Sequence, residues 1–201
     1  MSILDFQGLE CPQPVIRTKT FLEESPRNTL TVRVDNRAAV ENVTRFLQSQ
    51  GFAVDCGGES PVFTLTAARE GEATPAVMPA PVSTSPVAEN LSTVVMITHN
   101  VMGTGDKILG EKLMVNFLKT LPEMGDALWT IIMVNEGVKL ACGESAAADE
   151  LVSLESKGVR ILVCGTCLEH FSLMDEKRVG ETTNMLDIVT TLQVAPKVIN
   201  L

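Results

Sequence analysis

A proline-rich stretch at residues 71–90 divides this chain of 201 residues into two parts. It contains four prolines among small Ala, Ser, Thr and Val residues. Proline fixes φ and removes a backbone donor, so neither a helix nor a central strand can form there. This composition is typical of a semi-extended linker. We therefore expect one domain at residues 1–70 and another at residues 91–201, joined by a linker over residues 71–90.

The pattern of apolar residues in the first part predicts the element order β-α-β-α-β-β. Leu30, Val32 and Val34 alternate with polar residues, as in a strand with one buried face. Apolar residues then recur at helical spacing from residue 39 to residue 47. We expect a two-layer sandwich, with two helices packed on one face of a small sheet. The expected strands lie at residues 3–6, 30–34, 52–55 and 62–67, and the expected helices at about residues 12–24 and 39–47.

Continuous apolar runs in the second part indicate strands that are buried on both faces. Such runs are typical of a parallel sheet, and here they alternate with helical patterns. The fold class that follows is α/β, with an open parallel-sheet sandwich in this part of the chain. The expected strands lie at residues 94–98, 131–134, 161–163 and 197–201, and the expected helices at about residues 106–120, 146–157, 168–175 and 183–192.

Cys11 lies between the first expected strand and the first expected helix. Pro12 suits the first position of a helix, where its missing N–H costs nothing, so we expect Cys11 at the helix N-cap. The positive end of the helix dipole would then favour the thiolate, the form that attacks sulfur or selenium. The alternative is a structural role, because buried Cys behaves as a small hydrophobe. The Cys-Pro-x-Pro context favours chemistry.

Cys164 and Cys167 lie where a buried strand ends and a helix begins, which is where ligands of parallel sheets gather. A Cys-x-x-Cys pair there can hold a thiolate of low pKa beside a resolving thiol. Redox or sulfur-transfer chemistry is the favoured interpretation. Zinc binding with His170 would need a fourth ligand, and structural burial is the third alternative.

A Gly-rich segment precedes residue 106. We expect a plain turn there, capped by Asp106, rather than an anion-binding site.

Composition and charge argue against several classes of function. The chain has 16 Lys and Arg against 25 Asp and Glu, a net charge of −9, which disfavours nucleic acid and anionic membranes as partners. No apolar run approaches the roughly 18 residues of a membrane span, and no signal peptide is expected. Five cysteines fit a closed disulfide framework poorly, so we expect a reducing cytoplasm. Neither a metal nor a cofactor is expected.

The run Asp5-Phe6-Gln7-Gly8-Leu9-Glu10-Cys11-Pro12-Gln13-Pro14-Val15 resembles the signature of the TusA/SirA family. The resemblance covers residues 1–70 and implies the same order of elements. It also implies that Cys11 carries a persulfide and relays the terminal sulfur between proteins, as a sulfurtransferase-like carrier. Residues of the matching segment that would bind or orient this site are Gly8, Pro12, Pro14, Arg17 and Lys19.

Residues 162–167, with Asn184 and Met185, look like the DsrE-like half of the YedF proteins, which fuse both modules and are associated with selenium metabolism. This resemblance implies a cytoplasmic carrier that relays sulfur or selenium from Cys11, to or from the Cys164/Cys167 pair. The partners would be a cysteine desulfurase or other donor and a downstream acceptor protein. DsrE-like domains often oligomerise, so a homo-oligomer is expected. The alternative is a non-catalytic oligomeric adaptor whose thiols are incidental or redox-only.

Overall fold

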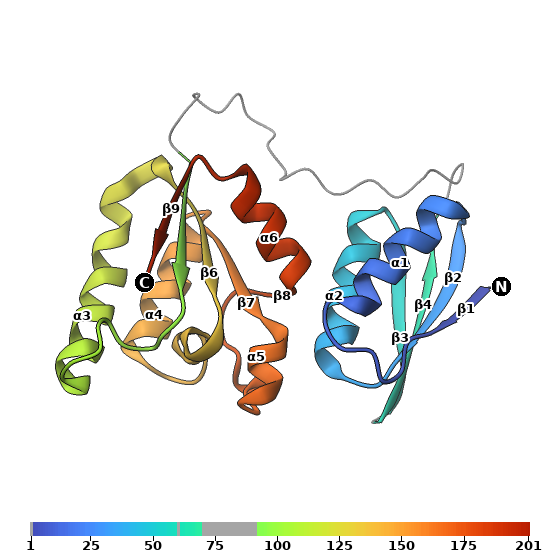
Figure 1. Cartoon of the computed structure of the whole chain (residues 1–201), viewed down its shortest axis with the longest axis horizontal. Coiled ribbons are helices and arrows are strands. Elements are labelled where there is room, and N and C mark those ends of the chain that lie inside the picture. The colour runs from blue at the N-terminus through green and yellow to red at the C-terminus, as the bar shows by residue number, and fades with distance from the viewer. Residues whose placement is uncertain (1, 60, 70–91) are drawn as a thin grey trace. The chain divides into compact units, whose positions relative to one another are not determined.

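The structure is a computed structural model that describes residues 2–59, 61–69 and 92–201. The chain divides into two compact units, Met1–Ser85 and Pro86–Leu201 (Figure 1). The predicted linker at residues 71–90 lies outside the described residues. Within the described ranges, no helix combines the length and the apolar character needed to cross a bilayer.

The first unit is a four-stranded sheet with two helices on one face (Figure 1). The strand order is β1-β2-β4-β3, in which β1 is parallel to β2 and the other neighbours are antiparallel. The predicted order β-α-β-α-β-β and the two-layer packing are confirmed. The elements are β1 (Ser2–Asp5), α1 (Gln13–Glu24), β2 (Thr29–Val34), α2 (Arg37–Ser49), β3 (Ala53–Glu59) and β4 (Val62–Ala68).

The alternation along β2 explains why the helices cover only one face of this sheet. Leu30, Val32 and Val34 are fully buried, whereas on the other face Thr29 and Arg33 are exposed and Thr31 is buried. Burial of each such aliphatic side chain contributes about 1.5–3 kcal/mol, which favours packing α1 and α2 on this side. The core of the first unit therefore lies between the helices and one face of the sheet.

The second unit is a five-stranded sheet in which all neighbouring strands are parallel. The strand order is β8-β7-β6-β5-β9, and the predicted parallel α/β sandwich is confirmed. In Figure 1 the strands lie between α3 and α6. Its strands and helices are β5 (Thr93–Ile97), α3 (Lys107–Thr120), β6 (Leu128–Met133), α4 (Ala146–Ser156), β7 (Arg160–Cys164), α5 (Gly165–His170), β8 (Glu181–Thr183), α6 (Met185–Val194) and β9 (Lys197–Asn200). Three 3-10 segments complete it: η1 (Leu121–Ala127), η2 (Asn135–Ala141) and η3 (Met174–Glu176).

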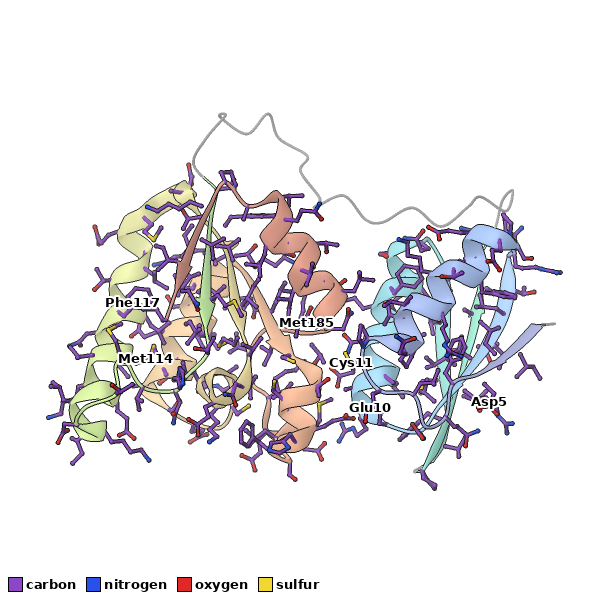
Figure 2. The ribbon with its side chains drawn as sticks, viewed as in Figure 1. Asp5, Glu10, Cys11, Met114, Phe117 and Met185 are labelled. Carbon is purple, nitrogen blue, oxygen red and sulfur yellow. The ribbon has the colours of Figure 1, made fainter. Side chains whose placement is uncertain are left out.

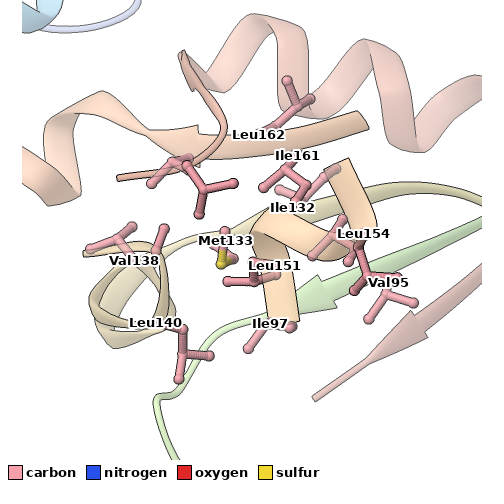
Figure 3. Packing of buried hydrophobic residues seen from close by; sticks show 14 of the residues in the cluster. Val95, Ile97, Ile132, Met133, Val138, Leu140, Leu151, Leu154, Ile161 and Leu162 are labelled. Carbon is pink, nitrogen blue, oxygen red and sulfur yellow. The ribbon is translucent and has the colours of Figure 1, made fainter. Parts of the chain in front are cut away.

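The core of the second unit joins the central strands to α4 and η2 (Figure 3). Ile97 of β5, Met133 of β6 and Leu151 of α4 are fully buried in it, and so is Val138 of η2. The segments that follow β5 and β6 are therefore packed against the same core as the strands. This packing fixes the carboxyl end of the sheet, where the Cys164/Cys167 pair lies.

Two elements of the second unit differ from the sequence-based expectation. The predicted helix at residues 168–175 is instead α5, which ends at His170, followed by a separate 3-10 turn. Ser172 has a left-handed φ of 58°, and the Leu173 N–H donates to the Leu168 carbonyl at 2.8 Å, which closes the helix end. Strand β8 was not predicted, because three residues are too few to show a pattern.

Candidate functional site

Cys11 lies in a tight turn between β1 and α1 (Figure 2). The Gln13 N–H donates to the Glu10 carbonyl at 2.8 Å, so Cys11 and Pro12 occupy the centre of a four-residue turn. The peptide bond between Cys11 and Pro12 is cis. The thiol is free and the residue is only partly buried. A reagent or a partner protein can therefore reach this cysteine.

The predicted N-cap position of Cys11 is wrong, because the N-cap of α1 is Pro12. The Pro12 carbonyl accepts from the Val15 and Ile16 N–H groups, both at 3.1 Å. Since the turn that closes at Gln13 comes first, the helix starts one residue later than expected. Pro14 then occupies the first helical turn, where a missing N–H is tolerated.

Gly8 ties the Cys11 turn to the sheet. Its φ of +73° lies in the left-handed region that glycine adopts without strain. Its N–H donates to Asp35 Oδ2 at 2.6 Å, and Asp35 directly follows β2. The neighbouring Leu9 N–H donates to the carbonyl of the buried Phe6 at 3.2 Å. The loop that presents Cys11 is thus held at a strand end and at a core residue.

The two predicted basic residues of this site lie on the helix that follows Cys11. Arg17 is exposed, and Lys19 forms an i,i+4 ion pair with Glu23 at 3.7 Å. Between them Thr18 is buried, and its hydroxyl donates to the Pro14 carbonyl at 2.7 Å. Arg17 therefore presents its charge at the surface of α1, and the partly exposed Lys19 shares its charge with a carboxylate.

The second unit brings Cys167 and Asn135 together at the carboxyl end of its sheet. Asn135 opens η2 directly after β6 and Val134, and Cys167 lies in α5, which follows β7. The backbone N–H of Asn135 donates to Cys167 Sγ at 3.1 Å. Asn135 has a φ of 49°, a left-handed conformation that Asn tolerates better than most residues. Sequence reasoning assigned no role to Asn135, since a backbone contact leaves no side-chain signal.

Hydrogen bonds lower the pKa of Cys167 to about 6, from an ordinary value of 9.0. The largest cause is the hydrogen bond with the Cys164 side chain, the Asn135 N–H adds to it, and the positive field of His170 contributes less. Partial burial acts in the opposite direction and raises the pKa. At neutral pH Cys167 is therefore mainly a thiolate, the nucleophilic form of cysteine.

Cys164 has a different environment from its neighbour in the pair. It is 3% exposed, closes β7 opposite Thr183 of β8, and is the N-cap of α5. Neither cysteine forms a disulfide. The structure thus brings the predicted pair together as one buried thiol and one partly exposed thiolate in hydrogen-bond contact.

A zinc site at the Cys164/Cys167 pair would need His170 as its third ligand. The His170 ring packs edge-on against Phe171, with the ring centroids 4.9 Å apart. Among the residues that the structure describes, no three or more His, Cys, Asp or Glu side chains are arranged to hold a metal ion.

Side-chain hydrogen bonds also hold the segments that follow β5. Asp106 caps α3 by accepting from the Leu109 N–H at 2.8 Å, which confirms the predicted capped turn. The Thr98 hydroxyl donates to the Leu201 carbonyl at 2.6 Å and is 2.8 Å from His99 Nδ1. These contacts join the end of β5 to the residue that follows β9.

Residues 2–66 match the family model described as Sulfurtransferase TusA. Over 55 residues the chain is 42% identical to "Putative sulfur carrier protein MJ0990" of Methanocaldococcus jannaschii. This alignment covers 27% of this chain and 73% of that protein.

Two solved structures are similar to parts of the chain. One is a SirA-like protein from Desulfitobacterium hafniense, with 30% identity and a TM-score of 0.31. The match covers 34% of this chain and 96% of the SirA-like chain. The other is the ychN protein from E. coli, with 14% identity and a TM-score of 0.43. The match covers 55% of this chain and 99% of the ychN chain. Because residues 2–66 match this family model and the chain is 42% identical to the sulfur carrier protein, the chain belongs to the TusA sulfurtransferase family.

Proposed function

We propose that this chain carries zero-valent sulfur or selenium as a persulfide or selenopersulfide on Cys11. The observation that carries the proposal is the place of Cys11, a partly exposed thiol in the Cys-Pro-x-Pro turn of the segment that matches the family. A carrier thiol must be reachable by two different partners, and partial burial still limits the access of water to the cargo. The turn meets both requirements.

Loading of Cys11 is a transfer of neutral sulfur without net oxidation. The Cys11 thiolate attacks the terminal sulfur of a donor persulfide, and the sulfur–sulfur bond of the donor breaks. The donor leaves as a thiolate, and Cys11 becomes the persulfide, as in thiol–disulfide exchange. A cysteine desulfurase would supply the sulfur. Arg17 and Lys19 on α1 would contact this donor or the acceptor protein.

Cys167 is the proposed acceptor in the second unit. It is a partly exposed thiolate, whereas its neighbour Cys164 is buried. The Cys167 thiolate would attack the terminal sulfur on Cys11, and Cys11 would leave as a thiolate. Because both units belong to one chain, the acceptor is present at a high effective concentration. The lowered pKa of Cys167 favours this role over an adaptor with incidental thiols.

The finer assignment of the whole chain is also a proposal. The parallel sheet with a cysteine pair at its carboxyl end supports a DsrE-like second domain, fused to a TusA-like first domain as in the YedF proteins. The same fusion suggests a cytoplasmic carrier that acts in selenium metabolism. Competitive loading with sulfide and selenide donors would identify the preferred cargo.

The loading experiment uses the full chain, a cysteine desulfurase and cysteine. Intact-mass spectrometry of the wild type should show the addition of sulfur, and Cys11→Ala should abolish the addition to the first unit. Cys56→Ala is the matched control, because Cys56 is an exposed thiol of the same unit. Equal sulfur addition to the wild type and Cys11→Ala would remove Cys11 from the scheme.

Exposed apolar side chains favour a second role of the second unit in assembly. Ile108 and Leu109 on α3 are 66% and 55% exposed, and Met185 and Val189 on α6 are 48% and 52% exposed. Such side chains are often found at protein interfaces. We therefore propose that the chain forms homo-oligomers through this unit. Light scattering on the full chain should give the mass of an oligomer, and a monomer at every concentration tested would contradict it.

A further inference from the structure

Cys164 has no part in a simple carrier mechanism, yet it is the direct neighbour of the reactive sulfur. It is 3% exposed, so a donor protein cannot deliver sulfur to it. Its side chain is hydrogen-bonded to Cys167. A buried thiol in contact with a partly exposed one is the arrangement of a resolving cysteine.

The backbone around Cys164 fixes this arrangement. Cys164 is the last residue of β7 and pairs with the buried Thr183 of β8. It is also the N-cap of α5, and Cys167 is on the first turn of the same helix. The two sulfurs are therefore carried by one strand end and one helical turn. They can meet without movement of a separate element.

The other buried thiol of the second unit provides a contrast. Cys142 donates to the Val138 carbonyl at 3.2 Å, which satisfies it within the fold. Burial raises the pKa of Cys142, as does the nearby carboxylate of Glu176. Cys142 is thus held as a neutral structural thiol, whereas Cys164 is directed at another sulfur.

We propose that Cys164 is a resolving thiol that releases the cargo of Cys167 as hydrogen sulfide, or as hydrogen selenide when selenium is carried. This inference rests on the proposed function, in which Cys167 accepts the atom. The sulfur of Cys164 attacks the inner sulfur of the Cys167 persulfide. A disulfide forms between Cys164 and Cys167, and the terminal sulfur leaves with both protons. The two cysteine sulfurs are oxidised and the zero-valent sulfur is reduced, so electrons balance.

The second unit would then convert a carried atom into a reduced product, rather than pass it on as a persulfide. Each turnover consumes the dithiol, so an external dithiol reductant must restore the pair before the next cargo arrives. The product would suit an acceptor reaction that uses inorganic sulfide or selenide. The oxidised pair has no thiolate that could accept another atom, so reduction of the pair limits the next release.

The test loads the full chain with glutathione persulfide, removes the excess, and follows two products without reductant. The wild type should release sulfide and form the Cys164–Cys167 disulfide in equal amounts. Cys164→Ser should keep the persulfide on Cys167 and release sulfide at about one tenth of the wild-type rate or below. Cys142→Ser is the matched control, since it changes another buried cysteine, and it should behave as the wild type does.

The outcomes separate this inference from the proposed function. Persulfide on Cys167 with equal sulfide release by Cys164→Ser and the wild type would overturn the resolving role alone. No persulfide on Cys167 in any protein would overturn both the resolving role and the acceptor role. The equal yields of sulfide and disulfide are measured in the wild type, so the inference can be tested even when Cys164→Ser does not fold. Sulfide without disulfide in the wild type would contradict it.

Discussion

The backbone N–H of Asn135 donates to Cys167 Sγ at 3.1 Å and thereby joins the ends of two neighbouring strands. This contact supports the thiolate from the β6 side, while the Cys164 thiol supports it from the β7 side. Neither donor is a basic residue. The Cys167 thiolate is thus stabilised mainly by hydrogen bonds, which explains how an acidic chain can hold a thiolate.

The reactivity of Cys167 should depend on pH with a midpoint near its pKa of about 6. Below that pH the thiol is protonated and reacts slowly; above it the thiolate dominates and the rate becomes flat. Peptide-resolved alkylation with iodoacetamide from pH 4 to 10 measures this midpoint. Cys142 should be alkylated more slowly than Cys167 over the whole pH range, because burial raises the pKa of the Cys142 thiol.

Replacement of Cys164 should weaken the Cys167 thiolate. Cys164→Ala removes the largest cause of the lowered pKa, so the midpoint of Cys167 alkylation should rise by about 1–2 units. The same alkylation profile measures this shift. An unchanged midpoint in the variant would contradict the described hydrogen bond between the two sulfurs.

Two substitutions at Asn135 should have opposite consequences. Asn135→Gly keeps the left-handed backbone at φ 49° and the N–H that contacts Cys167, so alkylation should stay close to that of the wild type. Asn135→Val places a β-branched residue in a conformation that it rarely adopts, which costs about 1–3 kcal/mol and displaces the donor. Thermal unfolding and Cys167 alkylation should both distinguish the pair. Equal behaviour of the two variants would show that the backbone conformation is unimportant here.

Gly137 should not tolerate a side chain. A Cβ at this position would collide with the Ile97 carbonyl oxygen, because η2 passes close to the end of β5. Gly137→Ala should lower the free energy of unfolding of the second unit by about 1–3 kcal/mol. Gly105→Ala is the control, since a Cβ there meets no atom within 4 Å. Denaturant unfolding measures both, and equal stability of the two variants would contradict the close approach.

The contact between Gly8 and Asp35 should affect the presentation of Cys11. Asp35→Ala removes the acceptor at 2.6 Å from the Gly8 N–H, which should destabilise the first unit by about 1–2 kcal/mol and slow sulfur loading of Cys11. Asp35→Asn retains an oxygen acceptor and should lie between the wild type and Asp35→Ala. Denaturant unfolding and the loading rate provide the two readouts. Unchanged loading in Asp35→Ala would show that Cys11 does not depend on this anchor.

Local patterns predicted most elements of both units. The alternation along β2 and the apolar runs of β5, β6 and β7 predict strands because burial in a sheet follows sequence directly. The predicted helix at residues 106–120 corresponds closely to α3, because the side chain of Asp106 caps it. Such signals lie within a few residues of the element that they define.

The site could be predicted only in part, because its decisive contacts are distant in sequence. The helix start near Cys11 depends on a turn that is anchored through Gly8 to Asp35, 27 residues away. The support of Cys167 by Asn135 spans 32 residues and uses the backbone. Neither contact leaves a local pattern. The sequence therefore indicated Cys11 and the Cys164/Cys167 pair as candidates, but neither the position of Cys11 outside the helix cap nor the difference between Cys164 and Cys167.

The proposed function depends on the entry of sulfur at Cys11. A time course of single-turnover loading by a cysteine desulfurase, quenched with iodoacetamide and read by peptide mass mapping, tests it most directly. We expect added sulfur first on the Cys11 peptide and later on the Cys167 peptide, and Cys11→Ala should delay or abolish the second signal. Sulfur that reaches Cys167 at the same rate with and without Cys11, or that never occupies Cys11, would show that Cys11 is not the entry point.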